Sequence, residues 1–353
     1  MDLRLVDRIV NAVLYEGYML YPYRPSAVKN RQRWNFGVLY PESYSAAQGA
    51  ADASSMQTEC LITVDEHAAL DVRARFLHLL AREIGVLIAD APAGDWNDAR
   101  FRVVESLDVD GQVFQTWQEA VERDVSVTGL SLSGLAAEPQ RVSFSFPSSR
   151  NAEPLKDEGG RVVGVMVRTH QAIEGAVELS AERVDGQAIK VTARIVNLTP
   201  LDDAKEGARD EALMRSLIST HTILGVCGGE FVSLLDPPLQ FREAAGRCQN
   251  IGTWPVLLGS EAERDAMLSS PIILYDYPQV APESAGDFFD GTEIDEMLAL
   301  RVMTLTEEEK REMRDADERT RRILEMTETL PAEQMMKLHG AVRGLRRAKG
   351  ESR

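Results

Sequence analysis

Two Asp-Gly dipeptides, each set between stretches of alternating apolar and polar residues, constrain the fold of this chain most. They are Asp110-Gly111, between residues 101–109 and 112–117, and Asp185-Gly186, between residues 176–184 and 187–198. An Asp-Gly pair readily adopts the positive φ angles that a two-residue hairpin turn requires. Residues 99–200 are therefore predicted to form an antiparallel sheet with one solvent-exposed face.

Helical periodicity flanks this β-rich region. Apolar residues recur at helical spacing over residues 1–17 and again over 70–84, so we expect an amphipathic helix in each stretch. Residues 117–125 fit either a short helix or part of a β loop. Towards the other end, Thr306 and Glu309 have capping-box spacing, which predicts the start of a further helix.

These patterns predict an α+β protein. We expect a β-rich domain with an N-terminal helix over residues 1–200, a mixed α/β core segment over 201–291 and a helical section over 292–353. The β-rich portion is expected to be sandwich-like or a twisted antiparallel sheet. Hydrophobic residues make up 44% of the chain and charged residues 27%, an ordinary globular composition, so a folded core is expected.

The net charge of −17 disfavours nucleic acid and anionic membrane surfaces as partners, because both require a positive footprint. No apolar run approaches the roughly 18 residues that span a bilayer, so membrane insertion is not expected. Asp2, Asp7 and Glu16 interrupt the apolar N-terminus and argue against a signal peptide, so we expect a cytoplasmic protein. Three widely spaced cysteines predict reduced thiols rather than a disulfide framework.

Aromatic and cationic residues alternate between residues 18 and 40. The aromatic residues are Tyr18, Tyr21, Tyr23, Trp34, Phe36 and Tyr40, and the cations are Arg24, Lys29, Arg31 and Arg33. This mixture occurs where proteins stack nucleic-acid bases, and also where arginine stems pack over rings inside a fold. The acidic charge of the whole chain favours the second interpretation.

The stretch from Ser219 to Leu298 combines glycines, prolines, aromatic residues and carboxylates. Gly228-Gly229 predicts a turn between two strands, with His221 near the first strand and Cys227 at the turn. A histidine and a cysteine that meet in space could bind a metal, with Cys248 and nearby carboxylates as further ligands. The stretch lacks the usual motifs of metalloproteases, hydrolases and nucleotide-binding loops, so no catalytic residue and no cofactor is predicted.

Carboxylates and aromatic residues crowd into residues 282–293. We expect this acidic loop to bind a partner protein through Pro282, Glu283, Asp287, Phe288, Phe289, Asp290 and Glu293. The same acids suit the first turn of a helix, which Asp290 or Thr292 would cap. A hard cation is a third interpretation, although the ligand order of a calcium loop is missing.

Three segments carry a resemblance to a known family: SLLDPP at 233–238, CQNIGTWPVLLG at 248–259 and SSPIILYDYPQVAPESAGDFFDGTEIDEMLALRVMTLTEEEKREMR at 269–314. With residues 15–41, they resemble an uncharacterised bacterial protein family associated with nickel-iron hydrogenase gene clusters. The resemblance covers most of the chain and carries no assigned catalytic residue. It implies an accessory or assembly role near a hydrogenase.

The sequence therefore predicts a non-catalytic cytoplasmic accessory protein that binds another protein, with a nickel-iron hydrogenase component as the candidate partner. The alternative is a metal-dependent enzyme or metal carrier that uses His221, Cys227, Cys248 and nearby carboxylates.

Overall fold

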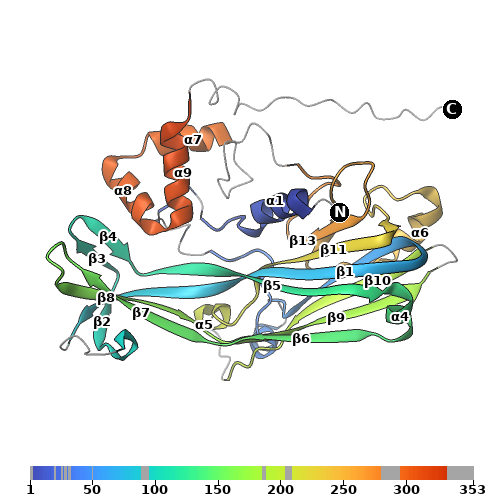
Figure 1. Cartoon of the computed structure of the whole chain (residues 1–353), viewed down its shortest axis with the longest axis horizontal. Helices are drawn as coiled ribbons and strands as arrows, with labels where there is room; N and C mark the ends of the chain where they lie inside the picture. Colours follow the sequence, from blue (N-terminus) through green and yellow to red (C-terminus); the bar gives the residue numbers. More distant parts are fainter. Residues whose placement is uncertain are drawn as a thin grey trace. The chain divides into compact units, whose positions relative to one another are not determined.

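A computed structural model shows how the chain folds (Figure 1). It describes residues 3–19, 21–24, 27, 30, 33–49, 51–88, 95–184, 188–202, 209–279 and 295–331. The chain divides into two compact units, which are Met1–Tyr18 with Gln32–Gln279, and Met19–Arg31 with Val280–Arg353. The first unit is built on an antiparallel sheet, and the described part of the second is mainly helical.

One strand of 33 residues, β1 (Ser55–Leu87), organises the first unit. Five strands pair with it, all antiparallel. Along one edge, in order, are β10 (Ala188–Asn197), β5 (Trp117–Ser131) and β2 (Phe101–Val104); along the other are β11 (Ile218–Phe231) and β8 (Val162–His170). The register with β11 shifts between Val64 and Ala69, and β11 pairs with β1 on both sides of this irregularity. On the opposite edge, the partner changes there from β10 to β5.

A long antiparallel ribbon crosses β1, and each of its two sides consists of two consecutive strands. Strand β6 (Gln140–Phe146) pairs with β9 (Ile173–Arg183), and β7 (Ser149–Lys156) pairs with β8. Strand β9 also pairs with β10 beside the first half of β1, whereas β8 pairs with the last part of β1 on the opposite edge. The ribbon must therefore pass over the middle of β1.

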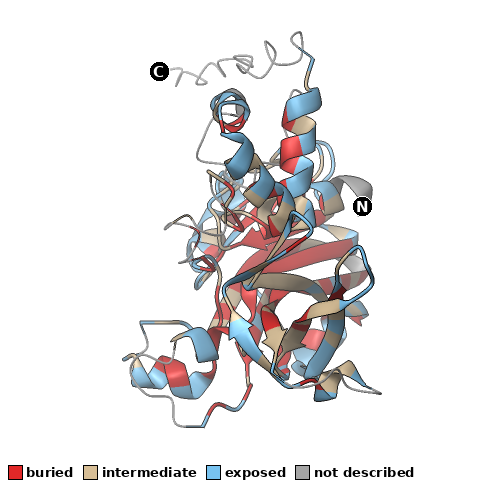
Figure 2. Ribbon diagram, turned by 90° about the vertical axis from the view of Figure 1, so that its left-hand side faces the viewer, coloured by how far each residue is buried: buried red, intermediate tan, exposed pale blue. Residues whose placement is uncertain are grey.

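The main core lies where the ribbon faces β1. The ring of Phe76 on β1 packs against Phe144 and Phe146 on β6, with centroids 5.8 and 6.1 Å apart. Leu132 and Leu135 from α4 (Leu132–Ala137) join the same core. Figure 2 shows buried residues concentrated along the strands. Each fully buried side chain of this size contributes about 1.5–3 kcal/mol relative to an exposed one.

The remaining elements of the first unit complete the sheet and cover one face. Strand β13 (Ala266–Ser270) pairs with β11, and β12 (Trp254–Leu257) pairs with β13. Helix α1 (Leu3–Leu14) packs on this part through Val6, Ile9 and Val10, so the predicted amphipathic N-terminal helix is confirmed. The other elements are α3 (Glu42–Ala47), η1 (Trp96–Asp98), β3 (Ser106–Val109), β4 (Gln112–Gln115), α5 (Arg209–Leu213), η2 (Leu239–Phe241) and α6 (Arg242–Gly246).

The second unit has three helices among its described residues: α7 (Asp295–Met303), α8 (Glu307–Ala316) and α9 (Glu318–Thr329). Thr306 and Glu309 form the predicted capping box at the start of α8. Arg24 joins the same unit through an ion pair with Glu309 at 3.1 Å. The guanidinium of Arg301 lies over the ring of Tyr21, so Tyr21 and Arg24 both contact these helices.

The α+β fold class is confirmed, and so is the hairpin at Asp110-Gly111, where β3 pairs with β4 and both turn residues have positive φ. Strands β9 and β10 pair as predicted, although their turn lies outside the described residues. Residues 117–125 belong to β5. The boundary expected near residue 200 separates no units, because β11 to β13 continue the sheet built on β1.

Two local predictions were wrong. Residues 70–84 form part of β1 and not a helix, because both faces of this stretch are buried and the burial hides the two-residue alternation of a strand. Gly228-Gly229 lies within the continuous strand β11 and makes no turn between strands. A Cβ on Gly229 would lie 2.6 Å from the carbonyl oxygen of Thr63, so this glycine permits close approach of β1.

Candidate functional site

The predicted metal ligand His221 is fully buried on β11. Its Nδ1 lies 2.6 Å from the carbonyl oxygen of Ser219, and its Nε2 lies 3.2 Å from Oγ of Ser270. The first contact makes Nδ1 the donor, which leaves Nε2 to accept from the Ser270 hydroxyl. Burial lowers the pKa of His221 to about 4, so the imidazole is neutral at pH 7 and held by the protein itself.

The structure does not bring the predicted metal ligands together. Cys227 is exposed, six residues beyond His221 on the same strand, which places it about 20 Å away at about 3.3 Å per residue. Cys248 packs beside Phe241 and Val232, and burial raises the pKa of its thiol to about 11. In the described part of the chain, no group of three or more His, Cys, Asp or Glu side chains could hold a metal ion.

Two histidines that the sequence did not pair meet where the ribbon crosses β1. The ring of His78 on β1 and the ring of His170 on β8 have centroids 4.9 Å apart. Arg123 on β5 reaches both, with Nε 3.5 Å from Nδ1 of His78 and Nη2 3.5 Å from Nε2 of His170. We call these three residues the His–Arg cluster. His78 is fully buried.

Burial dominates the electrostatics of the His–Arg cluster. It lowers the pKa of His78 to about 4, with further lowering from His170 and Arg123. The pKa of His170 is lowered by burial and then by Arg123. Oγ of Ser149 lies 3.0 Å from Nδ1 of His170, a contact that nucleophilic catalysis requires. The carbonyl oxygen of Pro147 lies 3.1 Å from Nε2 and orients the ring. Burial and the nearby guanidinium of Arg123 lower the pKa of His170, which makes it a poor base for that purpose.

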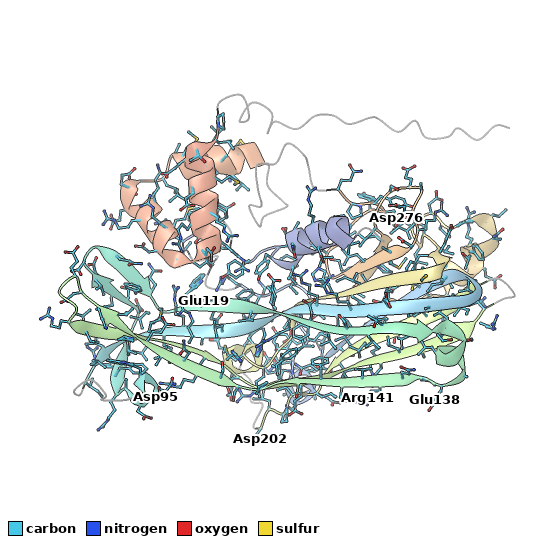
Figure 3. All side chains as sticks on the ribbon, viewed as in Figure 1. Asp95, Glu119, Glu138, Arg141, Asp202 and Asp276 are labelled. Carbon is cyan, nitrogen blue, oxygen red and sulfur yellow. The ribbon has the colours of Figure 1, made fainter. Side chains whose placement is uncertain are left out.

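A row of ion pairs continues along the same strands. The carboxylate of Glu119, labelled in Figure 3, accepts from Nη1 of Arg82 at 2.9 Å and from Nε of Arg168 at 3.0 Å. The three residues come from β5, β1 and β8, and Arg82 is buried. A buried guanidinium needs a partner for its charge. Glu119 therefore ties the last part of β1 to the strands on its two edges.

Arginine also packs over rings in the N-terminal segment. The guanidinium of Arg33 lies 3.7 Å from the ring centroid of Trp117, 4.5 Å from that of Trp34 and 5.1 Å from that of Tyr18. Its Nη1 donates to the carbonyl oxygen of Tyr18 at 2.9 Å. These buried contacts support the packing interpretation of the aromatic and cationic segment.

Large apolar side chains are exposed near the edge strand β12. Leu239, Ile273 and Tyr275 have exposed fractions of 81%, 72% and 85%. Six residues make up what we call the apolar surface: Leu235, Leu239, Ile251, Trp254, Ile273 and Tyr275.

Hydrogen bonds hold together the two segments that carry most of the apolar surface. Oγ of Ser233 donates to Asp276 Oδ2 at 2.5 Å, which joins the segment of Leu235 to that of Tyr275. The other carboxylate oxygen of Asp276, labelled in Figure 3, accepts from the amide of Leu257 on β12 at 2.8 Å. Ser270 pairs directly with Trp254, so the chain after β13 runs back beside β12 towards Leu257.

The acidic loop predicted to bind a partner lies outside the described residues. This applies to Pro282, Glu283, Asp287, Phe288, Phe289, Asp290 and Glu293. The described residues end at Gln279 before this loop, only four positions after Tyr275. Sequence reasoning missed the apolar surface because its apolar residues are spread over three segments and read as strand or loop core.

The fold and the apolar surface define an α+β protein built on one long antiparallel sheet, with apolar side chains exposed beside its edge strand β12. No protein-family model matches the chain, and no curated protein matches it either. Among the described residues, no helix has the length and apolar character needed to cross a membrane.

Proposed function

We propose that this protein is a non-catalytic accessory or assembly protein that binds another protein through the apolar surface. The exposure of Leu239, Ile273 and Tyr275 carries the proposal. Apolar side chains that gather on the surface of a protein commonly mark a binding site. Leucine, tyrosine and tryptophan side chains on a supported backbone are suited to fill pockets of a partner, and aromatic residues are common among interface anchors.

The charged groups inside the first unit support binding over catalysis. Glu119 is shared by two arginines, and His170 is surrounded by Arg123, Ser149 and the carbonyl oxygen of Pro147. These contacts explain the perturbed pKa values as a result of packing at the strand crossing. A structural origin of that kind accounts for them without a reaction.

The candidate partner is a component of a nickel-iron hydrogenase. This part of the proposal rests on the sequence resemblance of residues 233–238, 248–259 and 269–314. All three segments carry residues of the apolar surface: the first contains Leu235, the second Ile251 and Trp254, and the third Ile273 and Tyr275.

A capture experiment with matched variants tests the proposal. The tagged chain, a Leu239→Ser/Tyr275→Ser variant and an Ile88→Ser control are compared as baits in cytoplasm from the native host. Ile88 is exposed at the end of β1, away from these segments in sequence, so its replacement controls for general loss of apolar area. We expect hydrogenase subunits or maturation proteins with the natural chain and the control, and their loss with the double variant.

Two results would contradict the proposal. Recovery of no hydrogenase component by the natural chain would remove the proposed partner. Equal recovery by the double variant would show that the apolar surface does not carry the binding.

A further inference from the structure

We infer that the core of the first unit binds an internal water molecule among five buried hydroxyl side chains. The five residues, which we call the hydroxyl cluster, are Thr58, Thr220, Thr222, Thr253 and Ser269, and each is at most 1% exposed. They come from β1, β11, β13 and the residue just before β12. The inference concerns the interior of the fold and does not depend on the proposed function.

Three members of the hydroxyl cluster bond to one another directly. Oγ1 of Thr58 donates to Oγ of Ser269 at 2.8 Å, and Oγ1 of Thr253 lies 2.7 Å from the same Ser269 oxygen. Thr58 lies in the part of β1 that pairs with β10, whereas Ser269 is on β13, which pairs with β11. The hydroxyls of Thr58 and Ser269 therefore meet across the core and not along neighbouring strands.

Thr220 and Thr222 place two further hydroxyls on the same side of β11, because residues two apart in a strand share a face. Thr222 lies directly opposite Ser269 on β13, and residues paired in this way have Cβ atoms about 4.5–5.5 Å apart on one face of the sheet. The Oγ1 atoms of both threonines are buried and have no hydrogen-bond partner among the described residues. Two buried hydroxyls without a partner thus lie on the face that carries the bonded hydroxyl of Ser269.

The surroundings of the hydroxyl cluster are apolar. Met56 and Cys60 flank Thr58 on its face of β1, and Leu224 follows Thr222 on its face of β11. All three flanking residues belong to the main core. A hydroxyl in such surroundings costs free energy unless it is hydrogen-bonded. The unpartnered hydroxyls therefore require a ligand inside the core.

Water has the chemistry that the hydroxyl cluster requires. All five side chains are neutral, so a buried ion would have no countercharge among them. A hydroxyl donates one hydrogen bond and accepts up to about two, so Ser269, which contacts Thr58 and Thr253, retains one position. A buried water commonly makes about two to four hydrogen bonds to groups of this kind. A water bonded to Thr220, Thr222 and Ser269 would connect β11 to β13.

Thr222→Val tests the inference, because valine has nearly the same shape as threonine and lacks the hydroxyl. If a water is bound, the variant removes one of its partners, and the Tm should fall by about 2–4 °C, the effect of one hydrogen bond. If the hydroxyl is unbonded, valine removes a buried unsatisfied group and the Tm should rise. The sign of the change in Tm therefore separates the two cases.

Three further variants complete the thermal test. Thr128→Val replaces an exposed threonine on β5 and measures the effect of valine on a strand as such, so its shift is subtracted from the others. Thr58→Val loses the direct bond to Ser269 and should lower the Tm with or without a water. Thr220→Val repeats the measurement at the second unpartnered hydroxyl and should also lower the Tm.

A high-resolution crystal structure of the full chain locates the ligand directly. We expect density for one water within about 3.2 Å of Oγ1 of both Thr220 and Thr222, and its loss in Thr220→Val/Thr222→Val. The inference would be overturned by a map without such density, by density too large for water, or by a corrected Tm of Thr222→Val equal to or above that of the natural chain.

Discussion

His78 on β1 and His170 on β8 meet edge to face, with ring centroids 4.9 Å apart, where the ribbon crosses the longest strand. Arg123 contacts both rings from β5. Both imidazoles have lowered pKa values, chiefly through burial. The packing at this crossing therefore requires both histidines to be uncharged, because they lie beside the permanent cation Arg123.

Stability should fall as the pH is lowered from about 6.5 towards 4. The pKa of His78 and of His221 is lowered to about 4, so the unfolded chain binds more protons than the folded chain in this window. Each histidine contributes on the order of 3 kcal/mol to this loss if its unfolded pKa is about 6.5. Urea unfolding at pH 7 and pH 5 measures the part of this loss that falls above pH 5, about 2 kcal/mol for each histidine.

A variant assigns part of this pH dependence. His78→Gln keeps a hydrogen-bonding side chain that does not titrate, so its free energy of unfolding should change less between pH 7 and pH 5. A pH dependence equal to that of the natural chain would show that the pKa of His78 is the same in the folded and unfolded states.

Replacement of Glu119 by glutamine should destabilise the first unit by about 3 kcal/mol, because buried Arg82 loses the charge of its partner. Glu243→Gln is the matched control, since this glutamate is exposed and makes only a 3.9 Å pair with Arg247. Chemical denaturation of both variants measures the difference. Equal stability of the two would mean that Glu119 is not needed for the pairing of β1, β5 and β8.

Gly229→Ala should destabilise the protein by roughly 1–3 kcal/mol, because its Cβ would lie 2.6 Å from the Thr63 carbonyl oxygen. Gly246→Ala is the control, since a Cβ there has no neighbour within 4 Å and alanine favours helix α6. Thermal unfolding should give a lower Tm for the first variant and an unchanged or higher Tm for the second. An unchanged Tm for Gly229→Ala would refute the close approach of β1.

Cys227→Ser should change the free energy of unfolding by less than about 0.5 kcal/mol, because the side chain is exposed. Cys60→Ser should cost about 1–3 kcal/mol, since it places a hydroxyl in an apolar core. Elemental analysis of purified protein should give the same metal content for Cys227→Ser and the natural chain. A stoichiometric metal that disappears with Cys227 would restore the metal-carrier alternative.

Local sequence signals predicted the elements whose structure depends on residues that are adjacent in the sequence. The Asp110-Gly111 turn and the Thr306 capping box each require only a few adjacent side chains, and both are present. The strand at 70–84 escaped prediction because its identity depends on pairing with β5, β8 and β11, which are distant in the sequence, along its edges.

The candidate site residues show the same difference between contacts that are local in the sequence and contacts that are distant in it. His78 and His170 are 92 positions apart in the sequence, and only the crossing of the ribbon brings them together. His221 and Cys227 are close in the sequence, yet an extended strand separates them. Closeness along the chain predicts contact in a turn or a helix, and it predicts separation in a strand.

The length of β1 also determines how the first unit unfolds. Five other strands share its backbone, and they contact it at positions from Ser55 to Leu87. When any one of these strand pairs opens, β1 loses backbone hydrogen bonds, and the other four strands are bonded to the same β1 backbone. Native-state hydrogen exchange along β1 should therefore report one shared opening free energy, as a single cooperative foldon does.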